Sequence, residues 1–143
     1  MIEELPAETV AALRAAGAEA EAVFAAAAPG NPEELSLREM AFSARLVREA
    51  GEKVGLSQRI RAGWQRIAQG ALERNAAQGE IGHWLEELEE RWHALLRLRG
   101  EFIALWQERA HPEGMEEALR LYRGVLARYD VAAHWLRGQR QAL

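Results

Sequence analysis

Apolar residues in the second half of this chain recur at alternating steps of four and three, and this spacing constrains the fold more than any other feature. Between residues 80 and 110 the series is Ile81, Leu85, Leu88, Trp92, Leu95, Arg99, Phe102 and Trp106. Steps of this size place side chains on one face of an α-helix, whereas a strand alternates with period two. The sequence therefore predicts one long helix near residues 80–110.

The remainder of the chain shows the same helical periodicity, with few β-branched residues and no alternating stretch. Ser36 followed by Glu39 has the form of a capping box, which marks a helix start. Gly55 suits the end of that helix, and Ser57 can begin the next one. Pro-Gly-Asn-Pro at residues 29–32 and His-Pro-Glu-Gly at residues 111–114 interrupt the pattern.

These signals predict an all-α fold, in which short connections make neighbouring helices antiparallel. We expect a single domain, residues 1–143, built as an antiparallel bundle of about five helices. Their expected ranges are 7–28, 36–55, 57–79, 80–110 and the segment that follows residue 114.

Composition excludes several classes of function. The net charge is −4 and no part of the chain is strongly basic, so nucleic-acid binding lacks its electrostatic footprint. There is no run of about 18 apolar residues, so we expect no membrane span and a soluble protein, with the cytoplasm as the favoured compartment. The chain has no cysteine, which excludes disulfides, thiolate metal sites and cysteine nucleophiles.

Three Glu-x-x-His pairs raise the question of a metal site, because helical bundles use this spacing to bind metals. The pairs are Glu80/His83, Glu90/His93 and Glu108/His111. All lie on or just beyond one helix, and the first two are ~15 Å apart, so one metal centre cannot collect them. The chain also lacks a phosphate loop and a Gly-x-Ser-x-Gly motif. We expect no catalytic residue, metal or cofactor, and no enzymatic activity from this chain alone.

Three residues stand out as candidates for contact with a partner. Arg99 interrupts the apolar series, so its guanidinium needs a carboxylate or a partner surface, unless it extends past the core into water. Trp84 and Trp135 flank the core spacing and are therefore freer to face a partner.

A more specific signal lies between Phe102 and Met115. This stretch resembles the C-terminal helical region of bacterial β-N-acetylhexosaminidases of glycoside hydrolase family 20, which carries a Leu-Trp-x-x-Arg motif and then a Pro-x-Gly turn into the last helix. The matching residues are Leu105, Trp106, Arg109, Pro112 and Gly114.

The resemblance implies that the chain is a non-catalytic C-terminal domain that packs against the (β/α)₈ catalytic barrel of the same polypeptide. In that family an adjacent Asp-Glu pair of the barrel does the chemistry. The only aspartate here is Asp130, which is followed by Val131, so no catalytic residue carries over.

Two interpretations of the matching residues are open. In the first, Trp106, Arg109 and the turn at residues 112–114 seat the bundle on the barrel, since Trp106 and Arg109 share one helical face. In the second, Trp106 belongs to the core, Arg109 interacts with the C-terminus of its own helix, and the turn only joins two helices. The alternative function is a stand-alone protein-interaction or dimerisation module, with a homodimer as its simplest form.

Overall fold

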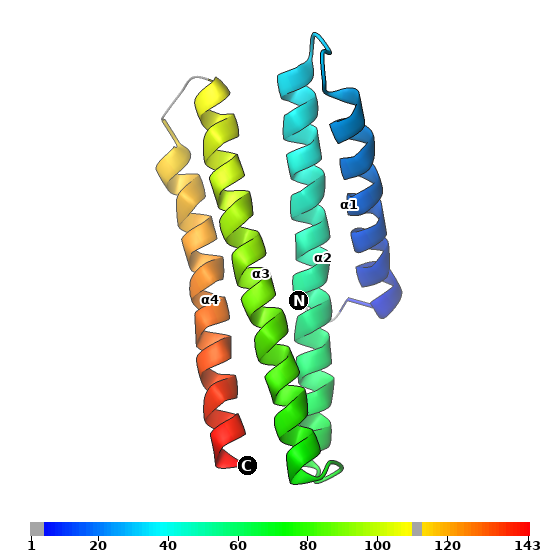
Figure 1. The fold of residues 1–143 in the computed structure, drawn as a ribbon, viewed down its shortest axis with the longest axis vertical. Coiled ribbons are helices and arrows are strands. Elements are labelled where there is room, and N and C mark those ends of the chain that lie inside the picture. Colours follow the sequence, from blue (N-terminus) through cyan, green and yellow to red (C-terminus); the bar gives the residue numbers. More distant parts are fainter. Residues whose placement is uncertain (1–4, 110–112) are drawn as a thin grey trace.

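The computed structural model describes residues 5–109 and 113–143, and this part of the chain is all-α with no strand (Figure 1). It contains α1 (Ala7–Ala27), α2 (Glu34–Ala68), α3 (Arg74–Arg109) and α4 (Met115–Ala142). Successive helices run in opposite directions, and α1 packs on α2, α2 on α3, and α3 on α4. The predicted all-α bundle with a long helix near residues 80–110 is confirmed, but the described residues form four helices rather than five.

The expected break at Gly55 and Ser57 is wrong, because both residues lie inside α2. A glycine within a helix costs about 1 kcal/mol relative to alanine, and here its missing side chain admits a neighbouring helix. A Cβ atom at Gly51, one turn earlier, would lie 3.0 Å from Cγ of Arg14 on α1. α2 instead ends at Ala68, where Gly70 turns the chain with a φ of 69°.

Two other helix boundaries also differ from the prediction. α2 begins at Glu34, so Ser36 and Glu39 lie within its first two turns and do not form a capping box. The side chain of Asn31 shapes the preceding turn, accepting a hydrogen bond from the backbone N–H of Glu33 at 2.9 Å. The predicted helix end near Gly79 is wrong as well, because α3 begins at Arg74 and continues through that residue.

α1 packs against α2 alone, and small residues make this pairing close. A Cβ atom at Gly17 would lie 2.8 Å from the backbone nitrogen of Arg48 and 2.9 Å from the carbonyl oxygen of Ala44. The two backbones therefore approach more closely at Gly17 than any larger residue allows.

The buried core lies between α2, α3 and α4 in two clusters. The first comprises Leu56, Ile81, Trp84, Leu88 and Leu136, and the second comprises Phe42, Leu98 and Leu105. Two apolar residues of α2, Met40 and Val47, lie outside this core and are 50% and 42% exposed. α2 packs on both α1 and α3, so its buried residues spread over more than one stripe of the helix.

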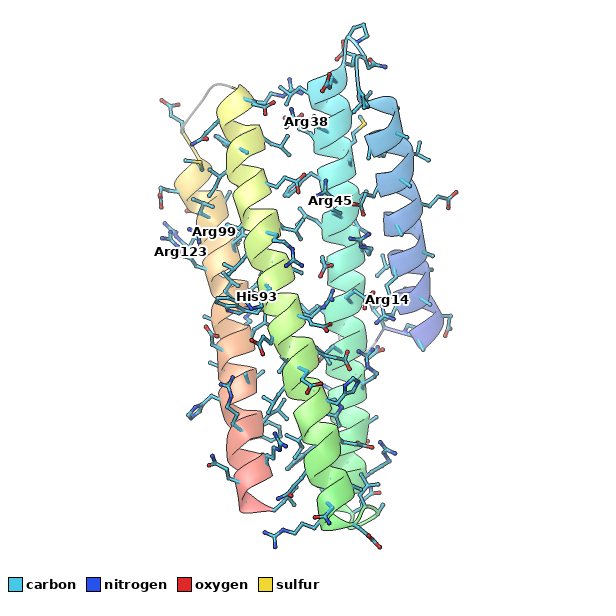
Figure 2. All side chains as sticks on the ribbon, viewed as in Figure 1. Arg14, Arg38, Arg45, His93, Arg99 and Arg123 are labelled. Atoms are coloured by element: carbon cyan, nitrogen blue, oxygen red, sulfur yellow. The ribbon has the colours of Figure 1, made fainter. Side chains whose placement is uncertain are left out.

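Arginine–glutamate pairs at a constant register connect α2 to α3, and Arg38 and Arg45 can be followed in Figure 2. The pairs are Arg38–Glu108 (2.7 Å), Arg45–Glu101 (2.5 Å), Arg59–Glu87 and Arg66–Glu80 (2.6 Å). From one pair to the next, α2 advances by seven or fourteen residues and α3 retreats by the same number. Exposed pairs contribute only about 0.2–1 kcal/mol each, so their main effect is to fix which residues of the two helices face each other.

Candidate docking groove

α2 and α3 enclose an apolar groove of about 510 Å³ at the end of the bundle where α3 reaches Arg109. Its lining is mostly aromatic and aliphatic, with a polar rim: Glu39, Phe42, Ser43, Phe102, Leu105, Trp106 and Arg109. Two of these residues, Trp106 and Arg109, are the interface candidates of the Leu-Trp-x-x-Arg motif. The groove therefore contains two of the seven sequence-predicted interface residues.

Phe102 is the centre of an aromatic cluster that forms the floor of this region. Its ring centroid lies 6.2 Å from that of Phe42, 5.2 Å from that of Trp106 and 5.6 Å from that of Tyr122. Aromatic pairs at such distances add about 0.5–1.5 kcal/mol beyond the area they bury. The cluster joins α2, α3 and α4, so the groove has a rigid floor.

Arg109 fixes the rim of the groove by joining α3 to α2. Its Nε and Nη2 atoms donate to the two carboxylate oxygens of Glu39, each at 2.7 Å, and Nη2 also donates to the hydroxyl of Ser36 at 3.0 Å. The hydrogen bond from Arg109 lowers the pKa of Glu39 below its ordinary value, although partial burial opposes the shift. Arg109 thus joins the two helices through a bidentate ion pair with Glu39, and it also lies in the last turn of α3.

Trp106 and Gly114 lie next to each other across the turn into α4. Gly114 has a φ of 82°, and a Cβ atom built on it would lie 3.6 Å from the indole ring of Trp106. Trp106 is half-buried, so it is neither a core residue nor a freely exposed one. Pro112, the fourth candidate of the motif, lies outside the described residues.

The remaining interface candidates lie away from the groove. Trp84 is only 5% exposed and its indole rests on Gly63 of α2, so the expectation that it flanks the core is wrong. Trp135 is 43% exposed and packs edge-on against Trp64 with their ring centroids 4.8 Å apart. Arg99 is half-buried on α3, and its Nε atom has no hydrogen-bond partner (Figure 2).

Sequence reasoning missed the α2 side of the groove. Phe42 was not among the predicted site residues, and the sequence predicted a helix cap for Glu39, whereas its carboxylate binds Arg109. The row of arginines and glutamates at seven-residue intervals sets residue 39 opposite residue 107 in antiparallel helices, so it would have placed Glu39 within one turn of Arg109 without identifying the pair itself.

The glutamate–histidine pairs do not converge on a site in the described chain. His83 contacts Glu87, its own neighbour one turn along, at 3.1 Å, while Glu80 binds Arg66. His93 lies 3.9 Å from Glu89, and His111 is outside the described residues. Within residues 5–109 and 113–143, no three histidine, aspartate or glutamate side chains are grouped so as to hold a metal ion.

A second hollow of about 340 Å³ lies between α3 and α4, beside Trp92, His93, Tyr129 and Asp130. Burial raises the pKa of Tyr129 to about 12, so its phenol stays protonated throughout the neutral range. This hollow is smaller than the apolar groove between α2 and α3, and no residue of the Leu-Trp-x-x-Arg motif lines it.

No family model matches the chain, and comparison with curated proteins and with solved structures gives no match either. None of the helices in the described part of the chain combines the length and apolar character needed to cross a membrane.

Proposed function

We propose that this chain is a non-catalytic helical docking module. We further propose that its partner is the (β/α)₈ catalytic barrel of a family 20 β-N-acetylhexosaminidase in the same polypeptide. The observation that carries the proposal is that Trp106 and Arg109, two of the residues that carry the family resemblance, line one apolar groove, and that Gly114 lies against Trp106.

The chemistry of the groove supports docking by an apolar protein segment. Its centre is aromatic, and among the described residues that line it the two charged ones, Glu39 and Arg109, neutralise each other. Anchors of protein interfaces are enriched in tryptophan set in an apolar pocket with a polar rim. The ion pair between Arg109 and Glu39 joins α3 to α2 at the rim, and a rim that is ordered before binding lowers the entropy cost of docking.

The proposal is tested in the polypeptide encoded by the complete reading frame, with Trp106→Ala as the perturbation. Truncating an interface anchor of this kind costs about 2 kcal/mol, or roughly a thirtyfold shift in a docking equilibrium. We expect the bundle and the barrel to unfold together in the parent and separately in the variant. Val23→Ala, which truncates a 58% exposed side chain on α1 away from the groove, is the control for a substitution outside the docking surface.

Two outcomes would overturn the proposal. One is a single unfolding transition and unchanged glycosidase activity in the Trp106→Ala polypeptide. The other is hydrolysis of a chromogenic N-acetylglucosaminide by residues 1–143 alone, which would place the chemistry in this chain.

A stand-alone interaction module is the second candidate function. One observation favours it: the outward face of α4, which lies apart from the groove, exposes Leu121 and Val131 by 72% and 70%.

A further inference from the structure

α1 stands at the edge of the bundle opposite α4 and takes no part in the two core clusters (Figure 1). Within the described residues, both clusters and the side chains packed against them come from α2, α3, α4 and the C-terminal residue. Of the 21 residues of α1, Val10 and Gly17 are buried. α1 packs against α2 and not against α3 or α4. The apolar core of the described chain is therefore complete without α1.

The contact between α1 and α2 is close but buries little apolar surface. Gly17 brings the two backbones together, and the side chain of Arg14 lies across Gly51 and Gly55 of α2. Hydrophobic stabilisation scales with the apolar area that is removed from water. A contact made largely by small residues and an arginine side chain therefore holds α1 less firmly than the core clusters hold the other three helices.

Ion pairs add to this attachment. Glu21 of α1 binds Arg45 at 3.1 Å and Arg48 at 2.6 Å, and Arg14 binds Glu52 at 3.2 Å. The five side chains are between 23% and 36% exposed. Ion pairs that water can reach are individually weak and are screened by salt. They can therefore open without a large loss of stability.

Arg45 keeps a partner on α3 when Glu21 leaves. Its two terminal nitrogens donate to the two carboxylate oxygens of Glu101, at 2.5 and 2.7 Å, whereas its Nε atom faces Glu21. The link between α2 and α3 at this level does not pass through α1. Removal of α1 therefore leaves the packing of α2 against α3 in place.

The two ends of α1 are joined to α2 in different ways. At one end, the connection of residues 28–33 turns at Gly30, which has a φ of 71° and where a Cβ atom would meet nothing within 4 Å. At the other end, the side-chain amide of Gln58 donates a hydrogen bond to the carbonyl oxygen of Leu5 at 2.5 Å. An open turn at one end and a side-chain hydrogen bond at the other allow α1 to swing away from α2.

We propose that α1 is a hinged cover over one face of α2, held closed by the ion pairs of Glu21, and that it detaches as a unit while α2, α3 and α4 stay folded. Opening of this kind is a local reaction that requires less free energy than global unfolding. It exposes the face of α2 that carries Gly51 and Gly55, so α1 controls access to that face. The proposal does not depend on the docking function of the groove.

Hydrogen–deuterium exchange of residues 1–143, followed by mass spectrometry, tests the proposal. A detached helix of this length is only partly stable in water, so its amides exchange once it leaves α2. In the wild type, the central amides of α1 should exchange about tenfold or more faster than those of α3, after correction for intrinsic rates. Equal protection of the two helices would contradict the proposal.

Ile81→Val tests whether α1 opens without the core. The substitution trims a side chain of the first cluster that is 0% exposed. It should accelerate exchange in α3 by about two- to tenfold and leave exchange in α1 unchanged. An equal acceleration in both helices would show that α1 unfolds only together with the core, and the proposal would be wrong.

Glu21→Gln tests what holds the cover closed. Loss of its two ion pairs should accelerate exchange in α1 by about twofold or more. Glu19→Gln removes the same charge from an exposed side chain of α1 and is the matched control, which should exchange as the wild type does. Equal exchange of α1 in the two variants would also overturn the proposal.

Discussion

The close pairing of α1 with α2 predicts that Gly17→Ala, one added methyl group, destabilises the fold. The new Cβ would lie 2.8 Å from the backbone nitrogen of Arg48 and 2.9 Å from the carbonyl oxygen of Ala44. Neither atom belongs to a flexible side chain, so the two helices must move apart. Overpacking of this kind costs about 1–3 kcal/mol.

The intrinsic preference of alanine for helix acts in the opposite direction, by about 1 kcal/mol. The net effect of Gly17→Ala is therefore a loss of up to about 2 kcal/mol in the free energy of unfolding. Gly100→Ala is the matched control, because Gly100 also lies inside a helix but its Cβ would meet nothing within 4 Å. That variant should gain about 1 kcal/mol, so the two substitutions differ by about 1–3 kcal/mol.

Urea denaturation followed by far-ultraviolet circular dichroism measures this difference. If the slope of the free energy against urea is about 2 kcal/mol/M, the two midpoints should differ by about 0.5–1.5 M. An equal gain of stability in both variants would show that α1 does not approach α2 as closely as described, and the reasoning would fail.

Three further predictions concern ionisable groups, each measured in a different way. Arg109 lowers the pKa of Glu39, so the Glu39 carboxylate stabilises the fold at neutral pH, and this contribution disappears as pH falls below the ordinary value of 4.5. The urea midpoints of Glu39→Gln and wild type should therefore converge in acid. Because the pKa of Tyr129 is raised to about 12, its phenol should ionise at a higher pH than an ordinary tyrosine in an ultraviolet absorbance titration. The free energy of unfolding should fall between pH 10 and 12. Ionisation of Tyr129 near pH 10 in the folded protein would contradict its burial. A double-mutant cycle of Arg45→Gln with Glu101→Gln should give a coupling free energy of about 0.5–1 kcal/mol. Additive effects of the two substitutions would show that this ion pair does not help to align α2 with α3.

The class of the fold could be predicted from the sequence because helical periodicity and chain breaks are local signals. The series from Ile81 to Trp106 indicated a long helix, and α3 covers it. The break around residues 29–32 likewise lies between α1 and α2.

The helix boundaries in the middle of the chain could not be predicted, because they depend on packing between helices. From the sequence alone Gly55 is expected to end a helix, but α1 packs against this glycine and α2 continues through it. Trp84 likewise appears as a flanking residue in the periodicity, yet it is buried because Gly63 on α2 leaves room for its indole. Both outcomes require knowing which helices are neighbours.

Only the α3 side of the groove could be predicted from the sequence. The Leu-Trp-x-x-Arg motif drew attention to Trp106 and Arg109 on α3, whereas the α2 residues opposite them carry no motif of their own. Their position follows from the antiparallel register, which the charges do encode: arginines at 38, 45, 59 and 66 match glutamates at 108, 101, 87 and 80. Pairing these two rows before assigning caps would have placed Glu39 within one turn of Arg109.

The most direct test of the docking function is to sequence the reading frame that contains this segment. We predict that it continues upstream into strand–helix repeats of a (β/α)₈ barrel that contains an adjacent Asp-Glu pair. A reading frame that encodes these helices without any barrel would contradict the assignment to a β-N-acetylhexosaminidase.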